Sequence, residues 1–168
     1  MTKHLNSLES LFIDELKDIY DAEKRMVAAL PDMAEAANSD DLKRGFRLHL
    51  DQTREHVSRI EEVFEQLEEE PHGRKCVGME GIIEEGKQLM RQRDSNPDVL
   101  DAALIATAQK AEHYEIASYG TVRKFAEQLG YDEIARKLNR TLDEESKINE
   151  RFTSMAVGHI NMEAMQVS

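Results

Sequence analysis

The sequence predicts an all-α protein: a four-helix bundle in which a long connection with a short fifth helix joins the second and third long helices. Ala, Leu, Glu, Lys and Arg dominate the 168 residues, Trp is absent and only three prolines occur, a composition that favours helices. Apolar residues recur every three or four positions over four long stretches. Short turns pair these stretches into two hairpins, and a longer segment connects the hairpins.

The first hairpin is predicted to contain helices at about residues 7–37 and 40–69. Asn6 or Ser7 can cap the first of them, because both side chains accept hydrogen bonds from free backbone N–H groups. Glu9 stands three residues after Asn6, which is the spacing of a capping box. We therefore expect the first helix to begin close to residue 7.

The second hairpin is predicted to contain helices at about 97–129 and 132–160, followed by a frayed tail, 161–168. Residues 71–96 connect the two hairpins, and 76–91 predict a shorter helix that several glycines weaken, so it should lean on a neighbour. A helix of that length covers roughly 24 Å. It can therefore return along much of the bundle, which gives the ferritin-like topology.

Length, charge and cysteine content narrow the functional classes. The chain is 33% charged and 40% hydrophobic, which predicts one globular domain, residues 1–168. Its net charge of −12 argues against nucleic acid or an anionic membrane as partner. No stretch is apolar enough to span a bilayer, the N-terminus lacks a signal-peptide core, and Cys76 is the single cysteine. Together these features predict a cytoplasmic protein.

Charged residues interrupt the apolar faces of the long helices. Glu112 and Glu115 lie one turn apart on the face of their helix that should be buried. A buried carboxylate is costly unless a cation or a metal pairs with it. Glu23, His56 and Glu145 interrupt the other three helices in the same way.

These interruptions share one level of the predicted bundle. Glu23 and His56 stand at similar distances from the first hairpin turn, and Glu115 and Glu145 at similar distances from the second. Equal rise along antiparallel helices places each pair level. Carboxylates and imidazole are ligands for iron or manganese. The sequence therefore predicts a metal site made of Glu23, His56, Glu112, Glu115 and Glu145, with a structural layer of buried polar pairs as the alternative.

Four stretches of the chain resemble the YciE/YciF family of ferritin-like bacterial stress proteins. They are YDAEK at 20–24, HLDQT at 49–53, KCVGMEGIIEEG at 75–86 and AQKAEHYEIASYGT at 108–121. The resemblance covers almost the whole chain. It implies a ferritin-like bundle, a homodimer, a site suspected to hold two metal ions, and induction under stress.

The histidines depart from the ferritin-like pattern, in which two helices each carry Glu-x-x-His. Thr53 stands three residues before His56, and Ile148 three residues after Glu145. We assign His49, two turns from His56, to hydrogen-bonded structure, with an extension of the polar layer as the alternative. A single, weak or carboxylate-rich metal site with at most one histidine is therefore expected instead of a high-affinity di-iron centre.

Two functions remain open from the sequence. One is a metal-binding protein that handles iron, manganese or peroxide under stress, with or without a metal-dependent oxidoreductase activity. The other is a metal-free, non-catalytic dimeric bundle with a structural or interaction role. No phosphate-binding loop, catalytic triad or zinc-finger spacing occurs, so no catalytic residue is assigned.

Overall fold

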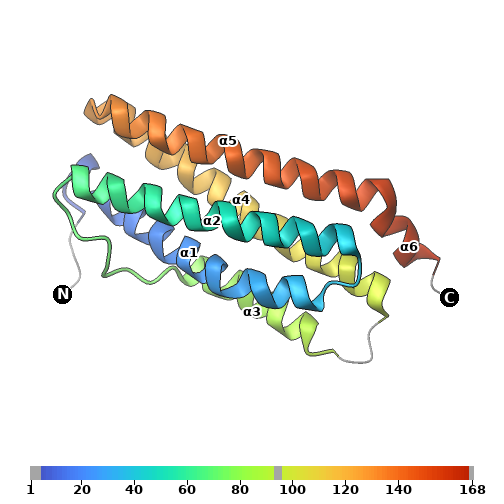
Figure 1. Ribbon diagram of the computed structural model, residues 1–168. Helices are drawn as coiled ribbons and strands as arrows, with labels where there is room; N and C mark the ends of the chain where they lie inside the picture. Colours follow the sequence, from blue (N-terminus) through green and yellow to red (C-terminus); the bar gives the residue numbers. More distant parts are fainter. Residues whose placement is uncertain (1–4, 93–95, 167–168) are drawn as a thin grey trace.

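A computed structural model describes residues 5–92 and 96–166, and every regular element in these ranges is a helix (Figure 1). This confirms the predicted all-α class. The helices are α1 (Leu8–Ala36), α2 (Asp40–Gln66), α3 (Val77–Met90), α4 (Pro97–Leu129), α5 (Asp132–Met155), a π-helical turn (Ala156–Ile160) and α6 (Asn161–Met165).

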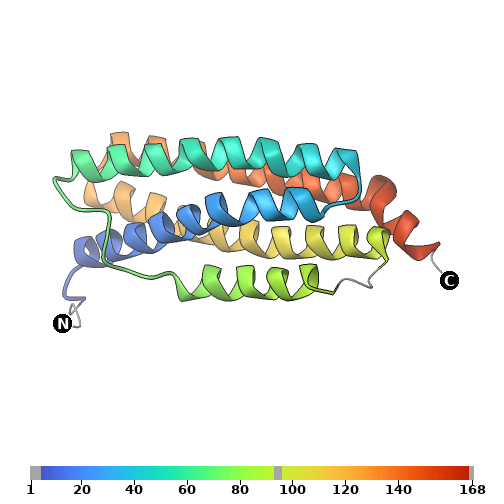
Figure 2. The same cartoon turned by 60° about the horizontal axis from the view of Figure 1, so that its bottom comes forward.

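The four long helices form two antiparallel hairpins, α1–α2 and α4–α5 (Figures 1 and 2). The connection after α2 leads back along the bundle into α3, so that α2 and α4 run in the same direction. α3 lies outside the four-helix core, against α1 and α4. The bundle therefore has the crossover topology expected from the sequence. No helix in the described part of the chain has the length and apolar character needed to cross a membrane.

Two glycines explain how α3 rests on α4. A Cβ atom at Gly78 would lie 2.6 Å from the Tyr114 ring, and one at Gly86 would lie 2.9 Å from Cγ2 of Thr107. Both distances are shorter than carbon atoms tolerate, so a larger residue would push the two helices apart. The glycines that weaken α3 as an isolated helix thus permit its close packing against α4.

Ser7, one of the two predicted N-caps, precedes the first helix as expected, whereas the capping box and the end of the second helix differ from the prediction. Ser7 caps α1: its Oγ accepts a hydrogen bond from the Ser10 N–H at 3.0 Å, and Ser10 Oγ accepts one from the Ser7 N–H at 3.1 Å. The capping box therefore uses Ser7 and Ser10 instead of the Asn6–Glu9 pair. At the same, open end of the first hairpin, α2 stops at Gln66, short of the predicted residue 69.

The C-terminal segment is more ordered than predicted. The chain continues from α5 through the π-helical turn into α6, which packs against α4. Ile160, the last residue of the turn, is completely buried and belongs to the core. The predicted frayed tail is therefore helical from Asn161 to Met165, while residues 167 and 168 lie outside the described part.

The core consists of two apolar clusters with a polar layer between them. Along each long helix, residues of one cluster precede the layer and residues of the other follow it. Phe12, Ile60, Val122 and Leu138 represent the first cluster, and Leu30, Phe46, Leu104 and Phe152 the second. The layer contains the buried side chains Glu23, His49, Thr53, His56, Glu112, Glu115, Thr141 and Glu145.

Candidate metal centre

Six ionisable side chains from all four long helices converge in the polar layer, and each is at most 1% exposed. Residues seven apart on α2, and three apart on α4, share a face of their helix because the helical repeat is 3.6 residues. α1 contributes Glu23, α2 His49 and His56, α4 Glu112 and Glu115, and α5 Glu145.

The six residues form two adjacent groups that share one carboxylate. Within each group, one ligand atom of every member lies within 4.8 Å of the others. Glu145 belongs to both groups, so the two positions that could hold a cation are neighbours. The first group comprises His49, Glu112, Glu115 and Glu145; the second comprises Glu23, His56 and Glu145.

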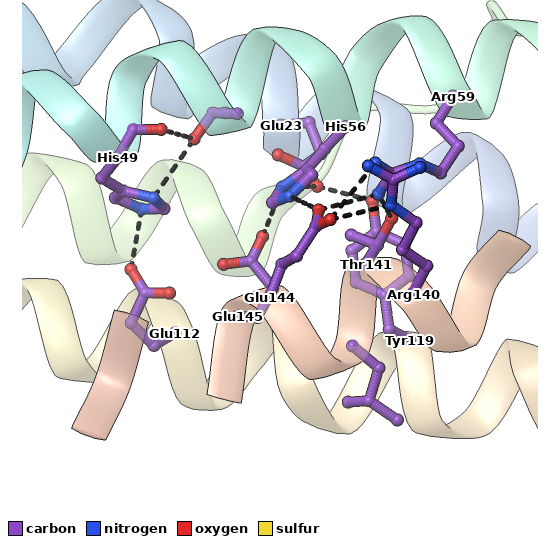
Figure 3. Close-up of polar contacts among 12 residues, drawn as sticks. Glu23, His49, His56, Arg59, Glu112, Tyr119, Arg140, Thr141, Glu144 and Glu145 are labelled. Atoms are coloured by element: carbon purple, nitrogen blue, oxygen red, sulfur yellow. Dashed lines mark hydrogen bonds and ion pairs between the residues drawn. The ribbon is translucent and has the colours of Figure 1, made fainter. Parts of the chain in front are cut away.

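The first group contains a histidine that presents a free nitrogen. His49 Nε2 lies 2.8 Å from Glu112 Oε1, without the geometry of a hydrogen bond. On the opposite side of the ring, Thr53 Oγ1 donates to the His49 carbonyl at 2.8 Å and lies 3.4 Å from Nδ1 (Figure 3). Because the hydroxyl proton is already used, Thr53 can only accept from Nδ1–H. Burial lowers the pKa of His49, so its ring is neutral and Nε2 carries a lone pair.

The second group contains a histidine held between carboxylates. His56 Nδ1 lies 2.7 Å from Glu145 Oε1 and 3.5 Å from Glu23 Oε1, and its Nε2 lies 3.0 Å from Glu144 Oε2 (Figure 3). Burial disfavours the imidazolium, but the carboxylates of Glu145 and Glu23 outweigh this and raise the pKa of His56 to about 11. Tyr119 Oη donates to Glu23 Oε1 at 2.5 Å. Without a metal, this half therefore carries its own positive charge.

Most carboxylate oxygens of the layer lack hydrogen-bond partners. Ten buried side-chain nitrogen and oxygen atoms in the described residues have no hydrogen-bond partner, and all except Arg123 Nε belong to the six residues of the layer. Burial raises the pKa of Glu112 and of Glu145 to about 8, and that of Glu115 well above its usual value; neighbouring carboxylates raise the pKa of all three further. A buried polar atom without a partner is costly, so these atoms mark the layer as a place that could hold a metal ion.

Other buried carboxylates of the protein are satisfied. Asp101 accepts hydrogen bonds from the backbone N–H groups of Asn38 and Ser39, both at 2.7 Å. Asp18 pairs with Arg74 Nε at 3.1 Å. In contrast, within residues 5–92 and 96–166 no Lys or Arg side chain lies within ion-pair distance of the four glutamates in the layer. Pairing with lysine or arginine therefore does not compensate these glutamates.

The structure brings together all five residues predicted as ligands, and it adds His49. The layer holds two histidines, so the expectation of one at most is wrong. His49 has a hydrogen-bond partner, as expected, because Thr53 Oγ1 lies 3.4 Å from its Nδ1, but its other nitrogen faces Glu112. The seven-residue spacing to His56 was the available signal, because it places both rings on one helix face. Glu144 gave no such signal, since it does not lie on the apolar stripe.

Comparison with known proteins establishes the family. The family described as "Domain of unknown function (DUF892)" matches residues 7–165. The chain belongs to the DUF892 family. Protein YciF of Escherichia coli (strain K12) is 43% identical over 162 residues, which are 96% of this chain and 97% of YciF. The resemblance to the YciE/YciF family seen in the sequence is therefore confirmed.

Solved structures similar to this chain share its fold. The crystal structure of the E. coli stress protein YciF superposes with a TM-score of 0.89 at 42% identity, covering 94% of this chain and 99% of that one. The YcfI protein of Rhodopseudomonas palustris, whose description suggests a structural role, gives 0.87 at 38% identity, with 92% and 98% coverage. A protein from Xanthomonas campestris pv. campestris gives 0.74 at 19% identity, with 96% and 100% coverage, and supports the fold alone.

Proposed function

We propose that this DUF892 protein binds two adjacent divalent metal ions, iron or manganese, in its polar layer. The observation that carries the proposal is the set of buried donor atoms without partners, drawn from the two groups that share Glu145. Four ionised carboxylates and two neutral imidazoles would balance the charge of two divalent cations. Ionised carboxylates in a dry core are stable only with such compensation.

The donor set supports iron or manganese. Oxygen and imidazole nitrogen suit these metals, whereas soft thiolate ligands would favour others. The ferritin-like di-metal proteins use four glutamates and two histidines, with one histidine on each of two helices. This chain offers the same donors, but both histidines come from α2 and α4 carries Glu-x-x-Glu. The missing Glu-x-x-His pairs therefore do not argue against a di-metal centre here.

The surrounding residues determine what such a centre could do. A bound iron or manganese pair supplies one-electron chemistry toward dioxygen or peroxide. Tyr119 holds one oxygen of Glu23, and His49 presents Nε2 because Thr53 occupies its Nδ1. The apolar clusters on both sides exclude water from the layer. Because the E. coli relative is called a stress protein, we infer a role in metal or peroxide handling under stress, in a cytoplasmic homodimer.

The alternative is a metal-free structural bundle, and one observation favours it. The His56 imidazolium already compensates part of the negative charge of Glu23 and Glu145 without a metal. In that case Glu112 and Glu115 would remain protonated, as their raised pKa values allow. A structural role would also match the description of the R. palustris relative.

Metal content separates the two functions. Protein purified without chelators and reconstituted anaerobically with Fe(II) or Mn(II) should hold about two ions per chain, one for each donor group. Glu115→Gln should lower this content and the thermal stabilisation by metal, because a ligand of the folded state raises stability by mass action. Glu150→Gln, which changes an exposed residue of α5, serves as the control. Far less than one ion per chain, unchanged by Glu115→Gln, would support the structural role.

A further inference from the structure

His56 has a carboxylate on each side, supplied by consecutive residues of α5. Nδ1 points into the layer toward Glu145, while Nε2 points outward to Glu144 at 3.0 Å (Figure 3). Glu144 belongs to neither of the two donor groups. Its side chain is 21% exposed, so it lies between the buried layer and the surface. The imidazole therefore connects the layer to a carboxylate outside it.

Two arginines fix Glu144 in this position. Arg59 Nη1 donates to Glu144 Oε2 at 2.9 Å, and Arg140 Nε donates to Oε1 at 3.0 Å. Arg59 is itself held by Thr141 Oγ1, 2.6 Å from Nη1. Glu144 is therefore an ionised acceptor that cannot turn into the layer without breaking both ion pairs.

An ionised acceptor at Nε2 decides which nitrogen of His56 can bind a metal. A carboxylate without a proton can only accept, so Nε2 must carry the hydrogen. The lone pair of the neutral ring then lies on Nδ1, the nitrogen that faces Glu23 and Glu145. A carboxylate behind a ligating histidine also fixes the ring orientation and makes the ligand more basic. No other side chain reaches His56 Nε2 within the described residues.

We propose that Glu144, clamped by Arg59 and Arg140, is the positioning residue of the metal centre: it holds Nε2–H of His56 and thereby presents Nδ1 to the ion between Glu23 and Glu145. The inference rests on the proposed function, because positioning has a purpose only if the layer binds metal. The two arginines also keep Glu144 from becoming an additional ligand. Glu144 thus acts on the second donor group alone, and the His49 group is independent of it.

The test measures the affinity of each site for Co(II), whose absorption spectrum reports ligand geometry. Wild type should bind two ions. Glu144→Gln keeps the shape of the side chain and removes its charge, so it should weaken one of the two sites by roughly 10–100-fold and alter the absorption bands of that site. The other site should keep its affinity. Glu144→Asp should restore part of the loss, and Glu150→Gln should match wild type.

The outcomes distinguish this inference from the proposed function. No Co(II) binding by wild type would overturn the proposed function itself. Two sites of unchanged affinity and spectrum in Glu144→Gln would overturn only the role of Glu144. Equal weakening of both sites, in step with a lower melting temperature, would also overturn it and indicate a purely structural ion pair. If Glu144→Gln does not fold, Arg140→Gln removes one clamp from the exposed side and should weaken the same single site less.

Discussion

Each half of the polar layer contains a histidine, and the two histidines differ in charge. His49 has the Thr53 hydroxyl behind it and is buried as a neutral ring. His56 has an ionised carboxylate behind it, so that a carboxylate lies beside each of its two nitrogens. Burial lowers the pKa of His49, and the carboxylates around His56 raise its pKa to about 11 against the effect of burial. The imidazole is thus a ready ligand in one half and an internal counterion in the other. The residue behind each ring makes this difference.

The difference also determines what each half requires without a metal. In the His56 half, the imidazolium compensates the carboxylates. In the His49 half no positive group is present, so Glu112 and Glu115 keep their protons, consistent with their raised pKa values. A metal would therefore displace a proton from His56 in one half and protons from carboxyl groups in the other. Metal binding and proton release should be coupled throughout the layer.

Replacing each histidine by leucine should produce the largest difference between the halves. His56→Leu leaves Glu23 and Glu145 buried without a counterion, and breaking a buried pair in this way costs about 3–5 kcal/mol. His49→Leu removes a neutral ring and its weak contact with Thr53, which should cost about 1 kcal/mol. Urea unfolding of the metal-free variants measures both values. Equal losses would show that the two rings do not differ in charge.

The response to pH should reverse when metal is bound. Without metal, burial raises the pKa of Glu112 to about 8 and the carboxylates around His56 raise its pKa to about 11, so both lie above their values in the unfolded chain. The folded state therefore retains protons that the unfolded chain has released, and stability falls as pH rises from 6.5 to 9. Each retained proton contributes about 1.4 kcal/mol per pH unit.

Bound metal removes these protons from the folded state, so the stabilisation by metal should grow over the same pH range. Melting curves at pH 6.5, 7.5 and 9, with and without Mn(II), measure both trends. Glu144 does not contribute in this window, because its lowered pKa affects stability only as pH falls from about 4.5 toward 2. A metal-induced shift that is independent of pH would contradict the proton displacement described above.

Much of this arrangement could be predicted from the sequence, for reasons that differ between residues. The helices followed from apolar periodicity and short turns, which are local. Glu23, Glu115 and Glu145 were found because each interrupts an apolar stripe at a level set by helical rise alone. The end of α2 was missed because Glu68 adopts a φ of 54°, which leaves the helical region and which composition does not reveal.

The two missed site residues required knowledge of tertiary contacts. His49 lies at the flank of its stripe, and its position opposite Glu112 depends on how α2 rotates against α4. Glu144 is polar and partly exposed, which is ordinary for α5. Arg140 stands one turn before it on α5, a spacing visible in the sequence, but Arg59 reaches it from α2 only in the folded protein. The sequence therefore predicts which charged side chains are buried better than it predicts which residues contact and orient them.

A matched pair of smaller substitutions examines these supporting contacts directly. Tyr119→Phe and Thr53→Val each remove a buried hydroxyl, one beside Glu23 and one beside His49. The tyrosine donates to a buried carboxylate, so its loss should cost about 1.5–3 kcal/mol in the metal-free protein. The threonine bonds neutral groups, and its loss should cost about 0.5–1.5 kcal/mol.

With Mn(II) bound, the Tyr119→Phe deficit should shrink, because a cation replaces the missing donor at Glu23. The Thr53→Val deficit should remain, since its hydrogen bond to the His49 carbonyl is independent of metal. If both deficits respond equally to Mn(II), the ion does not contact Glu23 and the second donor group lies outside the centre.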